Sequence, residues 1–427
     1  MRPGLLGLSV TLVLSWLAVS SPPLLSAQEG EAARAAEGVT DKEVLIGMSA
    51  PFKGASRGLG IELYRGSMAY LTDVNRAGGV HGRKIVLKAY DDGYQPDQAV
   101  KNTLKLMRED KVFLLFDYVG TPTVTRVLPL LKKFESLHFR LFFPFTGAQP
   151  QREAPYDTLA YNLRASYRQE TEGLVDNFLS AGRSRIAVFY QADAYGRSGW
   201  VGVREALAKR NQKMAGEATY ARGTKFTESL DRQVAILQEV KPDAIVSVGA
   251  YEACAAFIRD ARKAGLNVPI ANVSFVGSES MLKLLIDTSR EDGKDYTANL
   301  VNSQVVPSYE NLSMPAVKEY RALMAKYNPA PPVGLAEADY KPLEYSFVSL
   351  EGFLNAKLVV EVIRRLNGRP TRSQIAKTVE GIRAFDLGMG PTVSFAAERN
   401  QGSDAIYYTT VEDGRFVPIR DWKEWAQ

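Results

Sequence analysis

The sequence predicts an α/β protein made of two Rossmann-like lobes. Strand-like apolar runs alternate with helical patterns along most of the chain, which is typical of a parallel sheet covered by helices on both faces. The chain has 427 residues, more than one hydrophobic core usually holds. The alternation occurs in two successive series and ends in return segments of a different pattern, so we expect two lobes rather than one.

The first series begins with a strand of buried type at 44–48. Apolar residues then recur at three- and four-residue steps from Ile61 to Val74, which predicts a helix that Gly78-Gly79 ends. Residues 84–90 alternate as a strand. Asp97 begins the next helix, and strands are expected at 112–116 and 139–143.

The second series has strands at 186–190, 244–248 and 270–276. Helical spacing marks the segments around Trp200–Leu207, Leu230–Val240 and Cys254–Ala261, and Gly265 stops the last of them. The tail then predicts a long helix over 340–366 and antiparallel strands at 392–395 and 405–411.

The first 27 residues have the pattern of a cleaved secretory signal. Arg2 precedes an apolar stretch that Pro22-Pro23 interrupts, and small residues at Ser26 and Ala27 precede a polar segment. We expect a flexible leader over 28–40 and a soluble mature protein outside the inner membrane. The single cysteine, Cys254, excludes an intramolecular disulfide and a cysteine-based zinc site. The net charge of +5 and the absence of a basic stripe with aromatics give no reason to expect nucleic acid.

Ligands of open α/β sheets lie outside the carboxyl ends of the strands. Five loops leave such ends, at 117–123, 144–150, 191–198, 249–252 and 277–280, and they are rich in Gly, Thr, Ser and Tyr. Thr121 is a plausible N-cap with Pro122 at the first helical position, so its helix start could attract a carboxylate or merely cap a structural helix.

Tyr195 and Tyr251 each stand where a strand hands over to a helix and offer a flat face with a hydroxyl. Either could equally be a half-buried interface tyrosine. Glu279 follows the expected strand 270–276, where its carboxylate could pair with a ligand ammonium or only favour the helix dipole.

Catalytic and metal motifs are weak. Gly54-Ala55-Ser56-Arg57-Gly58 matches G-x-S-x-G after a strand, but a nucleophile needs a base, and His81 and His138 both precede strands at the opposite edge of the sheet. The better role for this loop is a flexible cover on the ligand. Asp91-Asp92 could suggest a metal but is more typical of a solvated turn. We expect no cofactor and no metal.

Seven motifs together resemble one family: VLIGMSAPFKG, GGVHGRKI, YDDGYQP, VGTPT, PFTGAQP, AYG and VGAYEA. They resemble the extracytoplasmic solute-binding proteins of the branched-chain amino-acid (Leu/Ile/Val) type, which feed ABC importers. The resemblance covers roughly 43–417, and GGVHGRK with YDD downstream is its most specific part.

The resemblance implies a type I periplasmic-binding-protein fold, with three hinge crossovers near 164–167, 303–306 and 390–392 and the ligand between the lobes. The first lobe would comprise 41–164 plus 306–390, and the second 165–305 plus 391–427. It also implies that an amino-acid carboxylate meets the 119–121 and 145–147 loops, that Tyr195 and Tyr251 face the ligand, and that Glu279 holds the ammonium.

Two departures leave the ligand open. Val119 stands where relatives carry a serine, and Thr146 is displaced by one position. Phe145, Tyr118 and Tyr167 could wall a flatter ligand. The expected ligand-binding residues are Tyr118, Val119, Gly120, Thr121, Phe145, Thr146, Gly147, Tyr167, Tyr195, Tyr251 and Glu279.

By this resemblance the protein is a non-enzymatic, periplasmic receptor that acts as a monomer with ABC permease subunits and binds a small polar ligand, foremost an amino acid. The alternatives are an aromatic or aliphatic carboxylate or amide as the ligand, a ligand sensor, and a serine hydrolase using Ser56.

Overall fold

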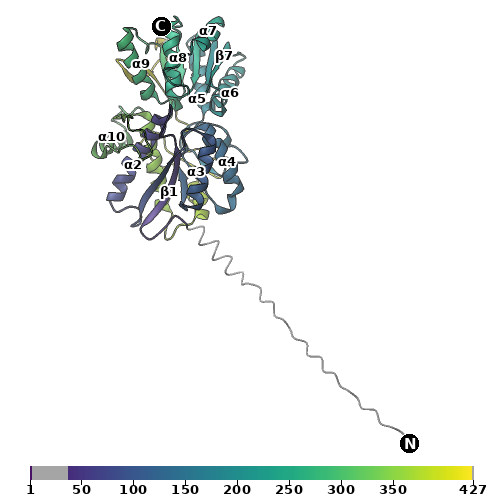
Figure 1. Cartoon of the computed structure of the whole chain (residues 1–427), viewed down its shortest axis with the longest axis vertical. Helices are drawn as coiled ribbons and strands as arrows, with labels where there is room; N and C mark the ends of the chain where they lie inside the picture. Colours follow the sequence, from purple (N-terminus) through teal and green to yellow (C-terminus); the bar gives the residue numbers. More distant parts are fainter. Residues whose placement is uncertain (2–36, 426–427) are drawn as a thin grey trace.

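A computed structural model describes residues 37–425 together with Met1. The chain folds into two α/β lobes stacked end to end, with the amino-terminal part of the chain in one lobe and the carboxyl terminus at the far end of the other (Figure 1). The signal peptide expected at 1–27 lies outside the described residues, apart from Met1. The leader expected at 28–40 is only partly outside them. Val39 packs in the first-lobe core and bridges to Val44, so the folded structure includes the end of that leader.

The first lobe is built on a five-stranded sheet in the order β2-β1-β3-β4-β5. All neighbouring strands are parallel. The strands are β1 (Glu43–Ala50), β2 (Lys84–Asp91), β3 (Leu114–Phe116), β4 (Leu141–Phe142) and β5 (Ala160–Tyr161). Because they are parallel, their carboxyl ends share one edge, and this edge faces the other lobe.

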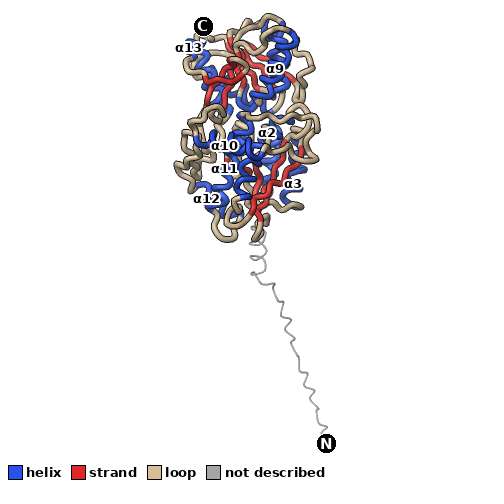
Figure 2. Tube along the Cα trace, turned by 90° about the vertical axis from the view of Figure 1, so that its left-hand side faces the viewer, coloured by secondary structure: helices blue, strands red, loops and turns tan. Residues whose placement is uncertain are grey.

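Helices cover both faces of this sheet. Two buried clusters separate the helices into those packed on one face and those packed on the other. The first group is α2 (Arg57–Arg76), α10 (Pro315–Tyr327), α11 (Phe347–Arg365) and α12 (Ile375–Glu380); the second is α3 (Pro96–Arg108) and α4 (Thr121–Lys133). Short 3-10 turns lie at Glu135–Leu137, Pro150–Arg152 and Arg372–Gln374. The tube view shows α2, α10 and α11 together in the lower lobe (Figure 2).

The second lobe has a seven-stranded sheet in the order β12-β11-β10-β9-β8-β6-β7. The strands are β6 (Ile186–Gln191), β7 (Gly216–Tyr220), β8 (Ala244–Val248), β9 (Ile270–Asn272), β10 (Leu300–Gln304), β11 (Tyr407–Glu412) and β12 (Arg415–Pro418). Strands β6 to β10 pair in parallel, whereas β11 and β12 are added antiparallel.

The helices of the second lobe are α5 (Tyr167–Ser180), α6 (Ala194–Ala208), α7 (Asp231–Glu239), α8 (Tyr251–Lys263), α9 (Ser278–Asp292) and the short α13 (Trp422–Trp425). Helix α5 contacts α6, while α7, α8 and α9 contact one another in series. Right-handed crossovers between parallel strands place these two groups on opposite faces of the sheet.

Three segments cross between the lobes. The first lies at 164–166, between β5 and α5, and the second follows β10. The third lies later than the expected boundary at 390–391. Val393 pairs with Phe385 and packs in the first-lobe core, and Ser403 still donates to the carbonyl of Leu163. The crossover therefore lies between Ser403 and β11.

Two other expectations for the tail differ from the structure. The helix expected over 340–366 begins only at Phe347, where Ser346 caps it, and the strand expected at 392–395 forms an isolated bridge. Residues 329–345 instead form a long segment without regular structure, which we call the strap. Within residues 37–425, no helix is long and apolar enough to cross a membrane.

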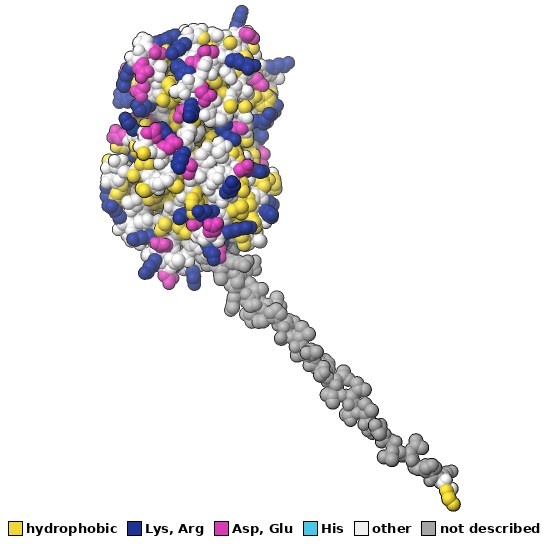
Figure 3. All heavy atoms as spheres, in the orientation of Figure 1, with side chains coloured by type: hydrophobic (Ala, Val, Ile, Leu, Met, Phe, Trp, Pro, Cys, Tyr) yellow, Lys and Arg dark blue, Asp and Glu magenta, His cyan; other side chains and the backbone are white. Residues whose placement is uncertain are grey.

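The lobes are closed on each other. One buried cluster is continuous between them and joins Phe52, Leu59 and Val119 of the first lobe to the core of the second. Charged side chains of both signs are interspersed over both lobes on the face shown in Figure 3, so this face has no single-sign patch.

Candidate ligand-binding site

Two loops from the first sheet join at the seam between the lobes. Val119 and Phe145 form a parallel bridge, Gly120 N–H donates to the Phe145 carbonyl at 3.1 Å, and the Phe145 N–H donates to the Tyr118 carbonyl at 2.8 Å. The hydroxyls of Thr121 and Thr146 lie 2.6 Å apart. The first turn of α4 and two paired hydroxyls therefore face the second lobe together.

Gly120 is the residue that makes this turn possible. Its φ is +101°, a conformation that side-chain-bearing residues rarely adopt, and a Cβ there would lie 2.1 Å from the ring of Tyr94. It also takes the N-cap position expected for Thr121, since α4 begins at Thr121 itself.

Five aromatic rings meet where the lobes touch. We call Tyr94, Phe145, Tyr167, Tyr195 and Phe275 the aromatic seam. The Phe275 ring centroid lies 4.6 Å from that of Tyr195, 5.3 Å from that of Phe145 and 6.0 Å from that of Tyr94, and Tyr167 lies 5.2 Å from Tyr195. All five rings are buried. Tyr94 and Phe145 come from the first lobe and Phe275 from the second, so the ring contacts cross between the lobes.

Backbone contacts hold the seam in register. Tyr167 N–H donates to the Gly147 carbonyl at 2.7 Å, and a Cβ on Gly147 would lie 2.6 Å from the Tyr167 ring. Across the lobes, Gln191 Nε2 donates to the Tyr94 hydroxyl at 3.5 Å. The absence of a side chain at Gly147 is what lets the Tyr167 ring pack this closely against the 145–147 loop.

Asp92 holds the backbone of Tyr94 by a hydrogen bond. The sequence predicts a solvated turn at Asp91-Asp92, and this is wrong for Asp92, which is 2% exposed. Its carboxyl accepts from the Ser49 hydroxyl at 2.8 Å and from Tyr94 N–H at 2.9 Å. Burial raises the pKa of Asp92 to about 7. Asp92 thus fixes the backbone position of Tyr94, one of the seam residues. Among residues 37–425, no group of three or more His, Cys, Asp or Glu side chains is placed to hold a metal.

A buried arginine from the first crossover lies against the seam. The Arg164 guanidinium is centred 4.6 Å from the Phe145 ring centroid and 5.9 Å from that of Tyr167. Its Nη2 donates to the Ser274 hydroxyl, its Nε lies 3.5 Å from Glu351 and its Nη2 lies 4.0 Å from Glu170. Burial raises the pKa of Glu351 to about 7, and the neighbouring Arg164 opposes that rise.

Tyr251 lies where α8 meets α2. Its hydroxyl accepts from Gly58 N–H at 3.3 Å, which joins α8 of the second lobe to α2 of the first. Arg57 beside Gly58 pairs with Glu337 and Asp339 of the strap. The expected cover loop is therefore held in place by the strap and by Tyr251.

The strap is anchored on a buried ion pair in α2. Arg65 donates to Glu62 at 2.7 Å and to the carbonyls of Pro329 and Leu343 at 2.7 and 2.6 Å, while Glu62 accepts from the Tyr340 hydroxyl at 2.9 Å. From this anchor the strap reaches α8 and α9 of the second lobe. A cavity of about 240 Å³ opens there, lined by Arg57, Tyr251, Glu252, Ser280, Lys283, Leu284, Asp287, Asp339, Tyr340, Lys341 and Leu343.

Glu279 lies at a different contact between the lobes. Its Oε1 accepts from Phe347 N–H at 3.1 Å, and its carboxyl is close enough to the Tyr309 hydroxyl for that group to oppose the effect of burial on the pKa of Glu279. Burial raises the pKa of Glu279 to about 8, and the charge of Glu62 adds to the rise. It thus meets the start of α11, and none of its hydrogen bonds reaches the seam.

The structure brings together most of the expected site residues. Those that meet at the seam are Val119, Gly120, Thr121, Phe145, Thr146, Gly147, Tyr167 and Tyr195. Tyr118 lies elsewhere: its hydroxyl bonds Thr103 at 3.1 Å and its ring packs under α3 and α4 in the first-lobe core. Sequence reasoning missed Phe275, Tyr94 and Arg164. Phe275 was hidden because the expected strand at 270–276 ends at Asn272 and continues as the 3-10 turn Ser274–Val276.

A hydrolytic triad on Ser56 finds no support in this geometry. Ser56 precedes α2 beyond the carboxyl end of β1 and is 5% exposed. His81 and His138 are exposed and precede β2 and β4, at the amino-end edge of the same parallel sheet. The imidazole of His81 instead contacts the Arg364 carbonyl at 2.8 Å.

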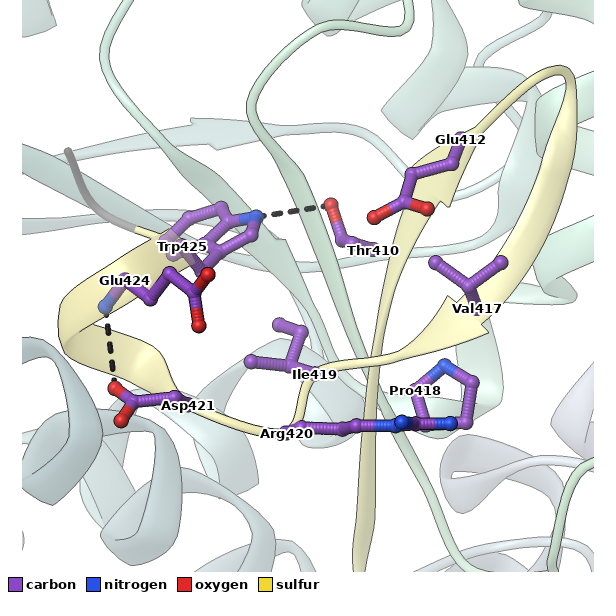
Figure 4. Close-up of a pocket in the computed structure, with 9 residues that line it drawn as sticks. All are labelled: Thr410, Glu412, Val417, Pro418, Ile419, Arg420, Asp421, Glu424 and Trp425. Carbon is purple, nitrogen blue, oxygen red and sulfur yellow. Dashed lines mark hydrogen bonds between the residues drawn. The ribbon is translucent and has the colours of Figure 1, made fainter.

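Two features of the second lobe lie away from the seam. A cavity of about 490 Å³ is lined only by residues between Thr410 and Trp425, from the β11–β12 hairpin and α13 (Figure 4).

The chain's one cysteine, Cys254, is buried with Sγ 3.2 Å from the Ser247 hydroxyl, and burial raises the pKa of its thiol to about 12.

The family model described as periplasmic binding protein matches residues 43–415. The chain belongs to the periplasmic binding protein family. A curated relative, the amino acid binding protein of Pseudomonas aeruginosa, is 25% identical over 229 residues, which cover 52% of this chain and 58% of that protein. The chain therefore spans little more than half the length of this relative.

Solved structures match over nearly the whole chain. That of a possible leucine/isoleucine/valine-binding protein from Rhodopirellula baltica SH 1 has a TM-score of 0.79 at 28% identity, covering 90% of this chain and 98% of that one. That of a branched chain amino acid ABC transporter from Thermus thermophilus with bound valine has a TM-score of 0.77 at 16% identity, covering 90% and 97%. Both solved structures share the overall fold of the present chain.

Proposed function

We propose that the protein is the periplasmic solute receptor of an ABC importer and binds a small organic molecule in the aromatic seam by closing its lobes. One observation carries this proposal: the loops that leave the carboxyl ends of strands in both sheets converge on five rings and two hydroxyls. Sites of open α/β sheets lie at such ends. Contacts that exist only in the closed state stabilise closure around a ligand.

The seam favours a ligand with a flat apolar body. Rings of both lobes are already in contact, and a planar molecule inserted between Phe145 and Phe275 would keep two aromatic faces. The acids beside the seam have other partners: Glu170 accepts from Ser274 and Ser303, and Asp193 accepts from Tyr195 N–H. Glu279, the residue that would hold the ammonium of an amino acid, lies at another contact between the lobes. We therefore favour an aromatic or apolar-bodied molecule over a compact amino acid.

The remaining parts of the proposal concern export and partners. We propose that residues 1–27 are a cleaved signal, that the mature chain begins at Gln28 and acts as a monomer, and that permease subunits receive the closed lobes. The protein would not be an enzyme. Intact mass of the protein recovered from the periplasm tests the cleavage site, and light scattering tests the monomer.

A thermal-shift screen tests the binding function. The panel contains amino acids, aromatic acids, aliphatic acids and the amide of each acid. Binding to the folded state raises the melting temperature, with about 2.7 kcal/mol of stabilisation at a hundredfold excess over Kd. We expect the largest shifts from aromatic members, and Phe275→Ala to lose them. A panel without any shift would contradict the proposed function.

A further inference from the structure

Arg164 has donor capacity that the protein leaves unused. Its side chain is only 1% exposed. Nη2 has a hydrogen-bond partner in Ser274, but Nη1 and Nε are buried and have none. The contact of Nε with Glu351, at 3.5 Å, is an ion pair without hydrogen-bond geometry. A buried N–H group without a partner is costly, so such groups commonly mark a place where another molecule binds.

The positive charge near Arg164 is not fully paired with carboxylates, which favours binding of an anion. Glu170 already accepts from Ser274 N–H at 2.8 Å and from the hydroxyls of Ser274 and Ser303 at 2.9 and 2.6 Å. A second arginine, the half-buried Arg152, donates to the carbonyls of Ala148 and Arg164 and to Gln401, and within residues 37–425 no carboxylate is among its hydrogen-bond partners. The two positive charges of Arg152 and Arg164 are therefore matched by Glu351 and by Glu170, whose oxygens already accept three hydrogen bonds from serines.

The seam supplies a second unused group beside the first. The Tyr167 hydroxyl is buried close to Gly147 and Thr146 but makes no hydrogen bond of good geometry to either, and its ring lies 5.9 Å from the Arg164 guanidinium. The same guanidinium stacks on Phe145, which meets Phe275 across the lobes. Arg164 and Tyr167 thus lie together beside the Phe145–Phe275 contact, where a planar ligand would be inserted.

We propose that Arg164, with the Tyr167 hydroxyl, binds the anionic end of the ligand, so that the seam takes organic carboxylates whose apolar body lies between Phe145 and Phe275. This inference rests on the proposed function. Arginine suits the role because its planar fork matches a carboxylate with two parallel hydrogen bonds. The ligand carboxylate takes over Nη1 and competes with Glu351 for Nε. If Arg164 served only as a hinge ion pair, ligand charge would not matter to it.

Calorimetry with matched acid and amide pairs tests this assignment. The probes are benzoate with benzamide, phenylacetate with phenylacetamide, and phenylalanine with its amide, because each pair has one shape and differs in the carboxylate. For the pair that binds wild-type protein best, we expect the acid to bind at least tenfold more tightly than the amide. We expect Arg164→Met to lose that preference, with amide affinity unchanged within twofold.

Arg168→Met is the matched control. Arg168 is four residues further on in α5, its side chain is 41% exposed, and it pairs with Glu153 and Glu205. This variant should keep the preference for the acid. Equal affinity of acid and amide in wild type, or an acid preference that persists in Arg164→Met, overturns the role of Arg164 while the receptor function stands. If none of the six probes binds, the role of Arg164 fails, while the receptor function is decided by the wider thermal-shift panel.

A second variant keeps the assignment testable if Arg164→Met does not fold. Glu351→Gln removes the competing negative charge and retains the shape of the side chain. We expect it to bind the acid severalfold more tightly than wild type and to leave the amide unchanged. An unchanged acid affinity in this variant would contradict the proposal.

Discussion

Glu279→Gln should remove a large part of the protein's loss of stability between acid and neutral pH. Glu279 accepts from Phe347 N–H at 3.1 Å, and burial raises the pKa of Glu279 to about 8 although hydrogen bonds from Phe347 and Tyr309 oppose the rise. Glutamine keeps the acceptor and is neutral, as the protonated carboxyl is. The variant therefore resembles the acid form of wild type at every pH.

The sign and size follow from proton linkage. A carboxyl whose pKa is higher in the folded state binds its proton more tightly there. Its stabilising contribution is present below the ordinary value of 4.5 and is lost as the pH rises through about 8. Between pH 5 and pH 7, this shift corresponds to about 2–3 kcal/mol of unfolding free energy lost by wild type and not by Glu279→Gln.

Urea unfolding at pH 5, 6, 7 and 8 measures the difference. Other buried carboxyls such as Asp92 and Glu351 titrate in both proteins, so the quantity of interest is the gap between the two profiles. Glu291→Gln, an exposed glutamate on the same helix, should follow wild type throughout. Parallel profiles for wild type and Glu279→Gln would refute the reasoning, because Glu279 would then ionise equally easily folded and unfolded.

Three further outcomes are expected. Tyr251→Phe removes the acceptor of Gly58 N–H between the lobes and should cost about 0.5–1.5 kcal/mol in thermal or urea unfolding; an unchanged midpoint would speak against this contact. Gly66→Ala places a Cβ 1.8 Å from the Ser349 carbonyl oxygen and should cost about 1–3 kcal/mol or more by the same assay, with a neutral result contradicting the tight fit of α2 on α11. Phe275→Ala should cost about 3–5 kcal/mol of unfolding free energy, and a cost below 1 kcal/mol would mean that the ring is not packed between the lobes.

Much of the architecture could be predicted because its signals are local. The alternation of apolar strands with helical spacing required parallel sheets, and parallel sheets bring the carboxyl ends of their strands to one edge. That rule placed Thr121, Phe145 and Tyr195 in neighbouring loops without knowledge of any contact. The motifs from GGVHGRKI to VGAYEA supplied the family, which the match over residues 43–415 confirms.

The rest could not be predicted because it depends on where elements end and how distant segments meet. Phe275 lies in an apolar run that reads as a strand through Val276, and only its sheet partners decide that β9 stops at Asn272. No motif in the sequence around Arg164 indicates that its side chain is buried or could bind a ligand. Its burial comes from Glu170, Ser274 and Glu351, which are brought together by the first crossover and α11.

The buried thiol of Cys254 makes the protein suited to optical reporting of lobe movement. A thiol that ionises only near pH 12 and has no exposed surface reacts poorly with maleimide dyes at neutral pH. A cysteine placed at the exposed Lys341 would therefore be the single reactive site in an otherwise unaltered chain. Because Lys341 borders the cavity between the strap, α8 and α9, a fluorophore there would change its surroundings whenever the two halves separate.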